Sequence, residues 1–270
     1  MMTLETATAV LAVLFAWWAS TGLVLALVWL GAEARRVAFA ASTFAALVGF
    51  FGAVVTARLE TTSAVWLGFV SALLVWGWHE LAFLLGIVTG PNRAPCPPDA
   101  RGLERFWLAT LTIIHHELAL FVTLLAVVGL TWGAPNPVAP LTFAALWVMR
   151  LSSKLNLFFG VRNLADEFLP AHLRFLRTYF RQSVRNPVLA ISILAGLGSV
   201  VAGVLLRDEL ARSVSQQLGL TVVITMLALG VLEHVFLAVP LGDAALWRWI
   251  IRSRTERTAA LSTAAPPVRP

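Results

Sequence analysis

The sequence predicts an all-α integral membrane protein with about seven transmembrane helices. Composition is the first observation, because 59% of the 270 residues are hydrophobic, only 13% are charged, and the mean hydropathy is +0.83. Soluble domains carry about 45–50% apolar and about 25% charged residues. The second observation is that the apolar residues form runs of about 20, the length that crosses a bilayer as a helix. Together these observations exclude an ordinary soluble enzyme, and a single cysteine excludes a disulfide scaffold.

Seven apolar runs follow one another along the chain. Each is predicted to be a helix, because backbone groups inside lipid must hydrogen-bond within their own segment. The expected spans are residues 7–30, 37–56, 62–88, 106–130, 138–160, 188–206 and 218–240. The first run is expected to be a retained span, since no Lys or Arg precedes Arg35 and the run is longer than a signal-peptide core. Residues 1–250 then form one polytopic membrane domain, and residues 251–270 are expected to be a disordered cytoplasmic tail.

The distribution of basic residues predicts the orientation. Of the 20 Lys and Arg residues, fifteen fall on the side of the C-terminal tail, three on the side of the N-terminus and two inside the fifth span. Cytoplasmic loops carry an excess of Lys and Arg. The N-terminus is therefore predicted to be periplasmic and the C-terminus cytoplasmic.

The cytoplasmic loop before the sixth span contains an amphipathic segment at about residues 166–183. Its leucines recur at helical spacing, and its basic residues share another face: Arg174, Arg177 and Arg181. This pattern predicts a basic interfacial helix attracted to anionic headgroups. The alternative is a simple extension of the neighbouring spans.

Small residues recur every four positions in the sixth span, at Ala195, Ser199 and Gly203. Such a stripe lets two membrane helices pack closely. We expect this stripe to be a packing face.

Polar side chains inside the expected spans are the main functional signal, because ionisable groups are costly in the bilayer. They occur in the third, fourth, fifth and seventh spans: His79, Glu80, His115, His116, Glu117, Arg150, Lys154, Asn156, Glu233 and His234. Counted from the cytoplasmic ends at ~1.5 Å per residue, the spans place such groups at similar depths of roughly 9 to 15 Å. We expect one buried polar cluster in the cytoplasmic half, with acids and bases paired.

Three interpretations of this cluster stay open at the level of sequence. It is structural if its three glutamates neutralise Arg150 and Lys154 and so fix which helices are neighbours. It is a ligand site if imidazoles bind a metal ion or the central metal of a tetrapyrrole. The candidate ligands are His79, His116 and His234. The third interpretation is a proton or ion path.

Known catalytic patterns are absent from these spans. The zinc-protease pattern H-E-x-x-H fails, because Phe83 and Leu120 occupy its last position after the two His-Glu pairs. The one lysine lies in the fifth span, which argues against a retinal protein. We therefore assign no catalytic residue.

Several runs with polar residues in unusual places resemble the photosynthetic complex assembly protein PuhE family. These runs are A-P-C-P-P-D-A-R-G from Ala94, R-F-W-L-A-T from Arg105, H-H-E-L-A-L from His115, L-T-W-G-A-P-N from Leu130, L-W-V-M-R-L-S-S-K-L-N from Leu146 and G-V-R-N-L-A-D-E-F-L-P-A-H-L-R from Gly160. The resemblance is densest over residues 90–181.

The resemblance implies an integral membrane protein of bacteria with bacteriochlorophyll-based photosynthesis, encoded with the reaction-centre H subunit and its assembly factors. It implies assembly of the reaction-centre and light-harvesting complex, with an influence on bacteriochlorophyll synthesis or delivery, in the inner, intracytoplasmic photosynthetic membrane. The expected partners are the lipid bilayer and reaction-centre or other assembly proteins. A nucleic-acid partner is not expected, because the charged residues lie between long apolar runs.

Two other functions remain as alternatives at this stage. One is an intramembrane enzyme that binds a metal ion, bacteriochlorophyll or a bacteriochlorophyll precursor through the His/Glu cluster. The other is a small-molecule transporter. The family supplies no catalytic residues, so every role assigned to the cluster rests on the residues themselves.

Overall fold

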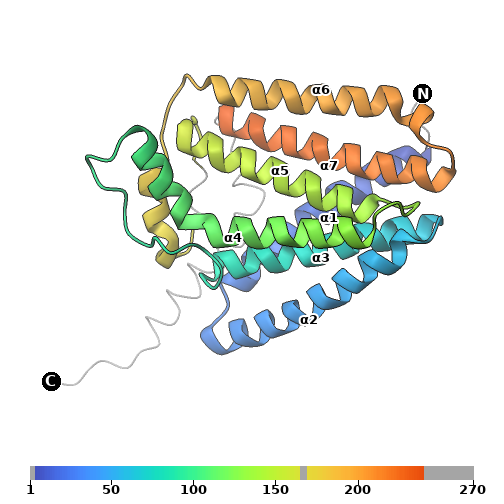
Figure 1. The fold of residues 1–270 in the computed structure, drawn as a ribbon, viewed down its shortest axis with the longest axis horizontal. Helices are drawn as coiled ribbons and strands as arrows, with labels where there is room; N and C mark the ends of the chain where they lie inside the picture. Colours follow the sequence, from blue (N-terminus) through green and yellow to red (C-terminus); the bar gives the residue numbers. More distant parts are fainter. Residues whose placement is uncertain (1–3, 165–168, 240–270) are drawn as a thin grey trace, which may run out of the picture.

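The computed structural model describes residues 4–164 and 169–239, and the long regular elements of this part are helices joined by loops (Figure 1). The helices are α1 (Leu4–Val28), α2 (Ala32–Ala57), α3 (Thr62–Leu84), α4 (Gly102–Leu130), α5 (Val138–Phe159), the 3₁₀ helix η2 (Ala171–Tyr179), α6 (Pro187–Leu210) and α7 (Val214–Ala238). In this part of the chain the β-structure amounts to an isolated bridge between Val161 and Gln182. The predicted all-α class is confirmed for the described residues, whereas the tail at 251–270 lies outside them.

Six of the helices are long and apolar enough to cross a membrane: α1, α2, α3, α4, α6 and α7. The chain is therefore a multi-pass membrane protein. The exception is α5, whose second half contains Arg150, Ser152, Lys154 and Asn156. Each expected span coincides with a helix, and no end that the structure describes differs by more than five residues.

Side chains of the preceding residues start three of the helices. Thr61 accepts a hydrogen bond from the backbone of α3, Ser213 from that of α7, and Asn186 from Val188 and Leu189 of α6. Pro187 then occupies the first turn of α6, where its missing N–H costs no helical hydrogen bond. These caps satisfy backbone donors that the first turn of a helix leaves unpaired.

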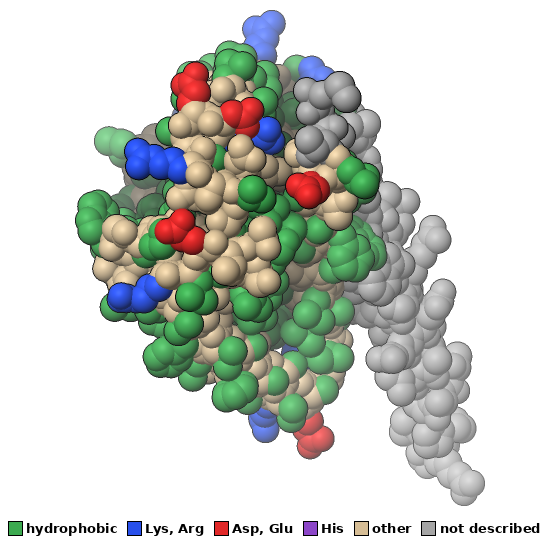
Figure 2. Space-filling view, turned by 90° about the vertical axis from the view of Figure 1, so that its right-hand side faces the viewer, with side chains coloured by type: hydrophobic (Ala, Val, Ile, Leu, Met, Phe, Trp, Pro, Cys, Tyr) green, Lys and Arg blue, Asp and Glu red, His purple; other side chains and the backbone are tan. Residues whose placement is uncertain are grey.

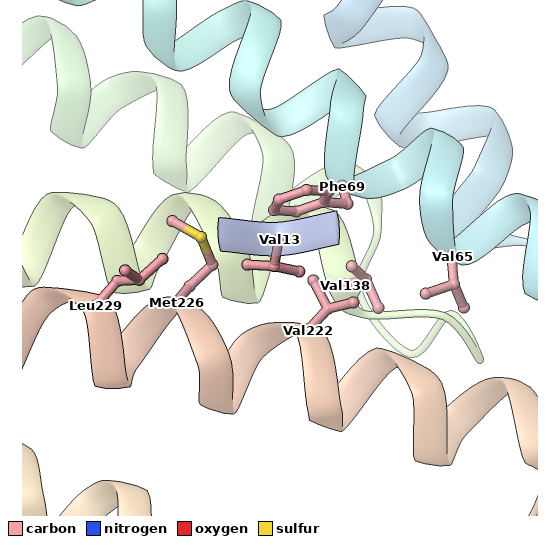
Figure 3. Packing of buried hydrophobic residues seen from close by; sticks show 7 residues of the cluster. All are labelled: Val13, Val65, Phe69, Val138, Val222, Met226 and Leu229. Atoms are coloured by element: carbon pink, nitrogen blue, oxygen red, sulfur yellow. The ribbon is translucent and has the colours of Figure 1, made fainter. Parts of the chain in front are cut away.

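The core lies between α1, α3, α5 and α7. Half of the apolar stretch of α3 and of α7 is buried, against 11% for α2 and α6. The largest buried cluster joins the four core helices: Val13, Val65, Phe69, Val138, Val222, Met226 and Leu229 (Figure 3). Around this core, α2 packs on α3, α6 packs on α7, and α5 contacts α3, α4, α6 and α7.

The helix α4 is bent, and its first part runs at an angle to the rest (Figure 1). The preceding loop inserts against it at the bend. The backbone N–H of His116 donates to the Thr89 carbonyl at 2.9 Å, and that of Asn92 donates to the Leu111 carbonyl at 3.1 Å. Such insertion into the helical ladder is a known cause of kinks. Gly90 permits this contact, because a Cβ there would lie 2.1 Å from the Leu111 carbonyl oxygen.

The segment expected to be an interfacial amphipathic helix is different in the structure. Of residues 166–183, positions 171–179 form η2, and 166–168 lie outside the described residues. The apolar face of η2, with Leu173 and Leu176, is buried in a cluster with Phe83 of α3. Protein therefore covers this part of the apolar face, and the interfacial position of the segment stays a prediction. Its basic residues are exposed: Arg174, Arg177 and Arg181.

The predicted small-residue stripe of α6 only partly coincides with the face that packs on α7. Ala195 and Ser199 are exposed, whereas Gly196 and Gly203 face α7. A Cβ on Gly196 would lie 2.7 Å from Val231, and one on Gly203 would lie 2.8 Å from Ile224. Gly203 is therefore the member of the predicted stripe that packs on α7, and Gly196, outside the stripe, joins it in this contact.

The two ends of the bundle differ in charge. The end that contains η2 holds ten described arginines, and we call it the arginine-rich end: Arg35, Arg36, Arg93, Arg101, Arg105, Arg162, Arg174, Arg177, Arg181 and Arg185. Figure 2 views the bundle from the opposite end, where acidic and basic side chains are scattered among hydrophobic ones. The basic residues of that end are Arg58, Arg207 and Arg212.

Candidate functional site

The helix α5 carries polar side chains on two of its faces. Arg150 and Lys154 are four residues apart and so lie on one face, while Ser152 and Asn156 lie on another. The first face is directed to α3 and α4 and the second to α6 and α7. The residues predicted to form one cluster therefore form two networks, which meet at α5.

The first network contains a short ion pair between α4 and α5. Lys154 Nζ lies 2.6 Å from Glu117 Oε1, and the two side chains are only 17% and 13% exposed. Trp147 Nε1 donates to the other Glu117 oxygen at 3.2 Å. Lys154 also lies over the ring of Phe83, 5.4 Å from its centroid. Both oxygens of the carboxylate are thus bound, as a buried charge requires.

The second ion pair of this network joins α3 to α5. Arg150 Nη2 lies 3.4 Å from Glu80 Oε2, and the Arg150 side chain is 46% exposed. The other Glu80 oxygen lies 3.8 Å from His116 Nε2, beyond hydrogen-bond distance. His116 is completely buried, and neither of its ring nitrogens has a hydrogen-bond partner among the described residues. A buried imidazole without partners is costly, so His116 is the least satisfied group of the site.

The second network is formed by neutral groups of α5, α6 and α7. His234 Nε2 lies 2.9 Å from Ser152 Oγ, which in turn donates to Ser192 Oγ at 3.1 Å. The Asn156 amide donates to Ser192 Oγ at 3.0 Å. Asn186, which caps α6, donates to Asn156 Oδ1 at 3.1 Å. This network therefore connects the start of α6 to the buried face of α5.

The remaining predicted residues lie outside both networks. His79 Nε2 lies 3.0 Å from Thr123 Oγ1 and so connects α3 to α4. Glu233 accepts a hydrogen bond from Trp17 Nε1 of α1 at 3.1 Å and has no basic group within 4 Å among the described residues. His115 is exposed on α4 and has no hydrogen-bond partner in the described chain. Two of the three glutamates, Glu80 and Glu117, thus pair with Arg150 and Lys154.

A cavity of about 140 Å³ lies beside the first network, between α1, α3, α5 and α7. Its charged lining consists of Glu80, Arg150 and Glu233, and Trp17 and Trp76 contribute aromatic rings. The half-exposed guanidinium of Arg150 therefore lies at a cavity wall.

The three histidines considered as metal ligands do not converge. Across residues 4–164 and 169–239, no group of three or more His, Cys, Asp or Glu side chains lies where it could hold one ion. His79 and His234 have separate hydroxyl partners, and His116 lies against the Phe83 ring with a centroid distance of 4.7 Å. Among the described histidines of the spans, His115 alone has the open surface that a tetrapyrrole ligand needs.

Sequence reasoning missed several residues of the site. Trp17 and Trp147 donate to glutamates, and Ser192 completes the neutral network. Arg105 is buried, donates to the Tyr179 carbonyl of η2 and lies 4.5 Å from the centroid of the Phe158 ring. Tryptophan and serine are common in membrane helices, so they gave no signal. Arg105 lies just outside the expected span at 106–130 and so was not considered among its polar residues.

Comparison with known proteins assigns the chain to a family. A family model described as "Protein of unknown function (DUF3623)" matches residues 2–258. The chain belongs to the DUF3623 family. This DUF3623 protein is 34% identical over 260 residues to a protein of Rhodobacter capsulatus, covering 95% of the chain and 94% of the relative. The relative's name is "Uncharacterized 30.4 kDa protein in puhA 5'region". No solved structure matches.

The arrangement in this DUF3623 protein is suited to holding helices together. One ion pair joins α3 to α5, which are not consecutive in the sequence, and the other joins the consecutive helices α4 and α5. The neutral network adds α6 and α7. Charged pairs with defined partners specify one set of neighbours, since any other arrangement leaves a charge unpaired in lipid.

Proposed function

We propose that this DUF3623 protein assists the assembly of the bacterial reaction-centre and light-harvesting complex in the inner, intracytoplasmic photosynthetic membrane. The relative from Rhodobacter capsulatus carries this proposal, because its name places it in the 5' region of puhA, and the resemblance in the sequence implies a role in photosynthetic assembly. The match extends over nearly the whole of both chains. The multi-pass helical fold supports a role inside the membrane.

We further propose that all seven α-helices cross the bilayer, with the N-terminus periplasmic and the arginine-rich end cytoplasmic. The excess of arginine at that end supports this orientation. The polar half of α5 can lie in the membrane because its charges are paired inside the bundle. In this arrangement the exposed arginines of η2 face cytoplasmic parts of the reaction-centre or other assembly proteins.

In this function the polar networks are a scaffold. They hold α3 to α7 in one arrangement, and so keep the lipid-facing and arginine-rich surfaces in a fixed relation. The partners of the complex bind to those surfaces. No catalytic step is assigned.

Gene replacement tests the assembly role. The gene of the relative is deleted in Rhodobacter capsulatus, and this chain is expressed in its place. We expect the deletion to lower the near-infrared absorbance of the membranes and this chain to restore it. A normal spectrum in the deletion strain contradicts the proposal. So does a spectrum that stays low when immunoblots find this chain in the membrane.

A second candidate function, transient pigment binding, is favoured by His115. Its exposed imidazole lies on a membrane helix without a partner in the described chain, and a neutral imidazole can bind the central metal of a chlorin. Protein purified in mild detergent from a pigment-making host should then show Soret and near-infrared bands. His115→Ala should remove them and His172→Ala should not. A spectrum without these bands rejects this candidate.

A further inference from the structure

The described lining of the cavity between α1, α3, α5 and α7 contains one more acidic than basic side chain. Three charged side chains line it, and two of them, Glu80 and Arg150, form an ion pair at 3.4 Å. The third, Glu233, receives a hydrogen bond from Trp17 but has no basic partner within 4 Å among the described residues. The neighbouring Lys154 is already paired with Glu117 at 2.6 Å. With both glutamates ionised, the described lining of the cavity therefore has a formal charge of −1.

This charge lies where water solvates it poorly. Glu233 is only partly exposed, and it lies five residues before the end of α7, roughly 8 Å along the helix. A single carboxylate in such surroundings is unfavourable unless a positive group joins it. The Arg150 guanidinium donates its hydrogen bond to Glu80 rather than to Glu233.

Aromatic rings provide the other half of a cation site. Trp17 and Trp76 both line the cavity with Glu233, and its lining also includes the apolar side chains of Leu73, Met226 and Leu229. Indole faces attract organic ammonium ions, and the attraction is larger where water is excluded. A volume of about 140 Å³ is similar to that of an engineered cavity of about 150 Å³ that binds benzene. The ligand is therefore small.

We propose that this cavity binds a small organic ammonium group, with Glu233 as the counter-ion and Trp17 and Trp76 as its aromatic walls. The group belongs either to a free alkylammonium ion or to the headgroup of a choline lipid that enters between the helices. The Glu80–Arg150 pair forms the opposite wall and keeps the remaining charge neutral. This proposed site does not depend on the proposed assembly role, and failure of one proposal leaves the other unaffected.

Titration calorimetry of the detergent-purified full chain tests the proposal with two probes. Tetramethylammonium chloride represents the free ion, and a short-chain phosphatidylcholine represents the lipid headgroup. We expect at least one of them to bind, and the one that does identifies the source of the ammonium group. Tetrabutylammonium should not bind, because its four butyl chains exceed the cavity. The proposal is overturned if neither probe binds, or if tetrabutylammonium binds as well as tetramethylammonium.

Variants locate the binding in this cavity. Glu233→Gln should weaken the affinity about tenfold or more, since it removes the counter-ion but keeps an oxygen that accepts from Trp17. Trp76→Leu should weaken it several-fold without changing the charge. The exposed Glu104→Gln at the start of α4 serves as the matched control and should bind as the unmodified chain does. Unchanged affinity in both cavity variants would contradict the assignment.

Discussion

At the scale of single residues, burial explains the pairing of Lys154 with Glu117. A buried ion pair adds little net stability, but removal of one partner leaves an uncompensated charge. We therefore expect Lys154→Met to destabilise the protein by about 3 kcal/mol, and Glu117→Gln by a similar amount. The double variant should recover most of this loss. Thermal unfolding in detergent measures the cycle, and additive losses would contradict direct pairing.

Gly90 offers a second residue-level prediction. A methyl group at this position would enter the backbone of α4 at Leu111 and Thr112, which cannot move without opening the bend. We expect Gly90→Ala to lower the free energy of unfolding by about 3 kcal/mol, which is at the upper end of the range for overpacked positions.

Gly129→Ala in the same helix is the control for Gly90→Ala, because nothing lies within 4 Å of its Cβ. This control should be neutral or slightly stabilising, by up to about 1 kcal/mol. Equal unfolding temperatures for the two variants would show that the loop does not press on α4.

The sequence was sufficient to identify the ionisable residues but not their partners. Ionisable groups in apolar runs are conspicuous, so Glu80, Glu117, Arg150 and Lys154 were recognised directly. Pairing depends on rotation about each helix axis, and an error of one residue turns a side chain by about 100°. Glu233 illustrates this limit, because its observed donor is Trp17 of the first helix rather than a base.

At the scale of elements, η2 and the loop before α4 form one hydrogen-bonded unit. Tyr179 accepts from the Asn92 amide at 2.9 Å and donates to the Ala94 carbonyl at 3.2 Å, while Cys96 N–H donates to Thr178 at 2.8 Å. The loop is therefore held by η2 as well as by α4. This explains how a proline-rich loop keeps a fixed course.

Removal of the Tyr179 hydroxyl should loosen this unit selectively. We expect Tyr179→Phe to speed amide exchange over residues 89–100 and to lower stability by only about 1 kcal/mol. Thr110→Val on the exposed face of α4 is the control and should leave that exchange unchanged. Exchange that is equally slow in the Tyr179→Phe variant would mean that the loop is held by α4 alone.

The ends of the helices could be predicted from the sequence, whereas the surface against which a short element packs could not. The length of each apolar run predicted the ends of the helices to within a few residues, because a helix that crosses lipid needs about 20 apolar residues. In the segment of η2, the helical spacing of the leucines predicted an apolar face. It did not predict which surface covers that face. Bilayer and protein are both apolar, so the sequence cannot distinguish contact with Phe83 of α3 from contact with lipid.

At the scale of the whole molecule, chemical labelling of the single cysteine tests the proposed orientation in the membrane. Cys96 lies in the loop at the arginine-rich end and is partly exposed. A membrane-impermeant maleimide should label it in inverted vesicles and not in intact spheroplasts.

A displaced cysteine provides the control for this topology experiment. Trp132, between α4 and α5, is 83% exposed at the opposite end of the bundle. Trp132→Cys in a Cys96→Ser background should give the reverse labelling pattern. Labelling of Cys96 from the outside would invert the proposed topology.

The most direct test of the account combines the scaffold with the assembly role. In the gene-replacement strain of Rhodobacter capsulatus, we expect Lys154→Met alone to lower the near-infrared absorbance of the membranes. The double variant Glu117→Gln with Lys154→Met should restore it, because an apolar and a neutral side chain leave no charge unpaired. A double variant that is present in the membrane but fails to restore the absorbance would contradict the account, since these residues would then act chemically rather than as a scaffold.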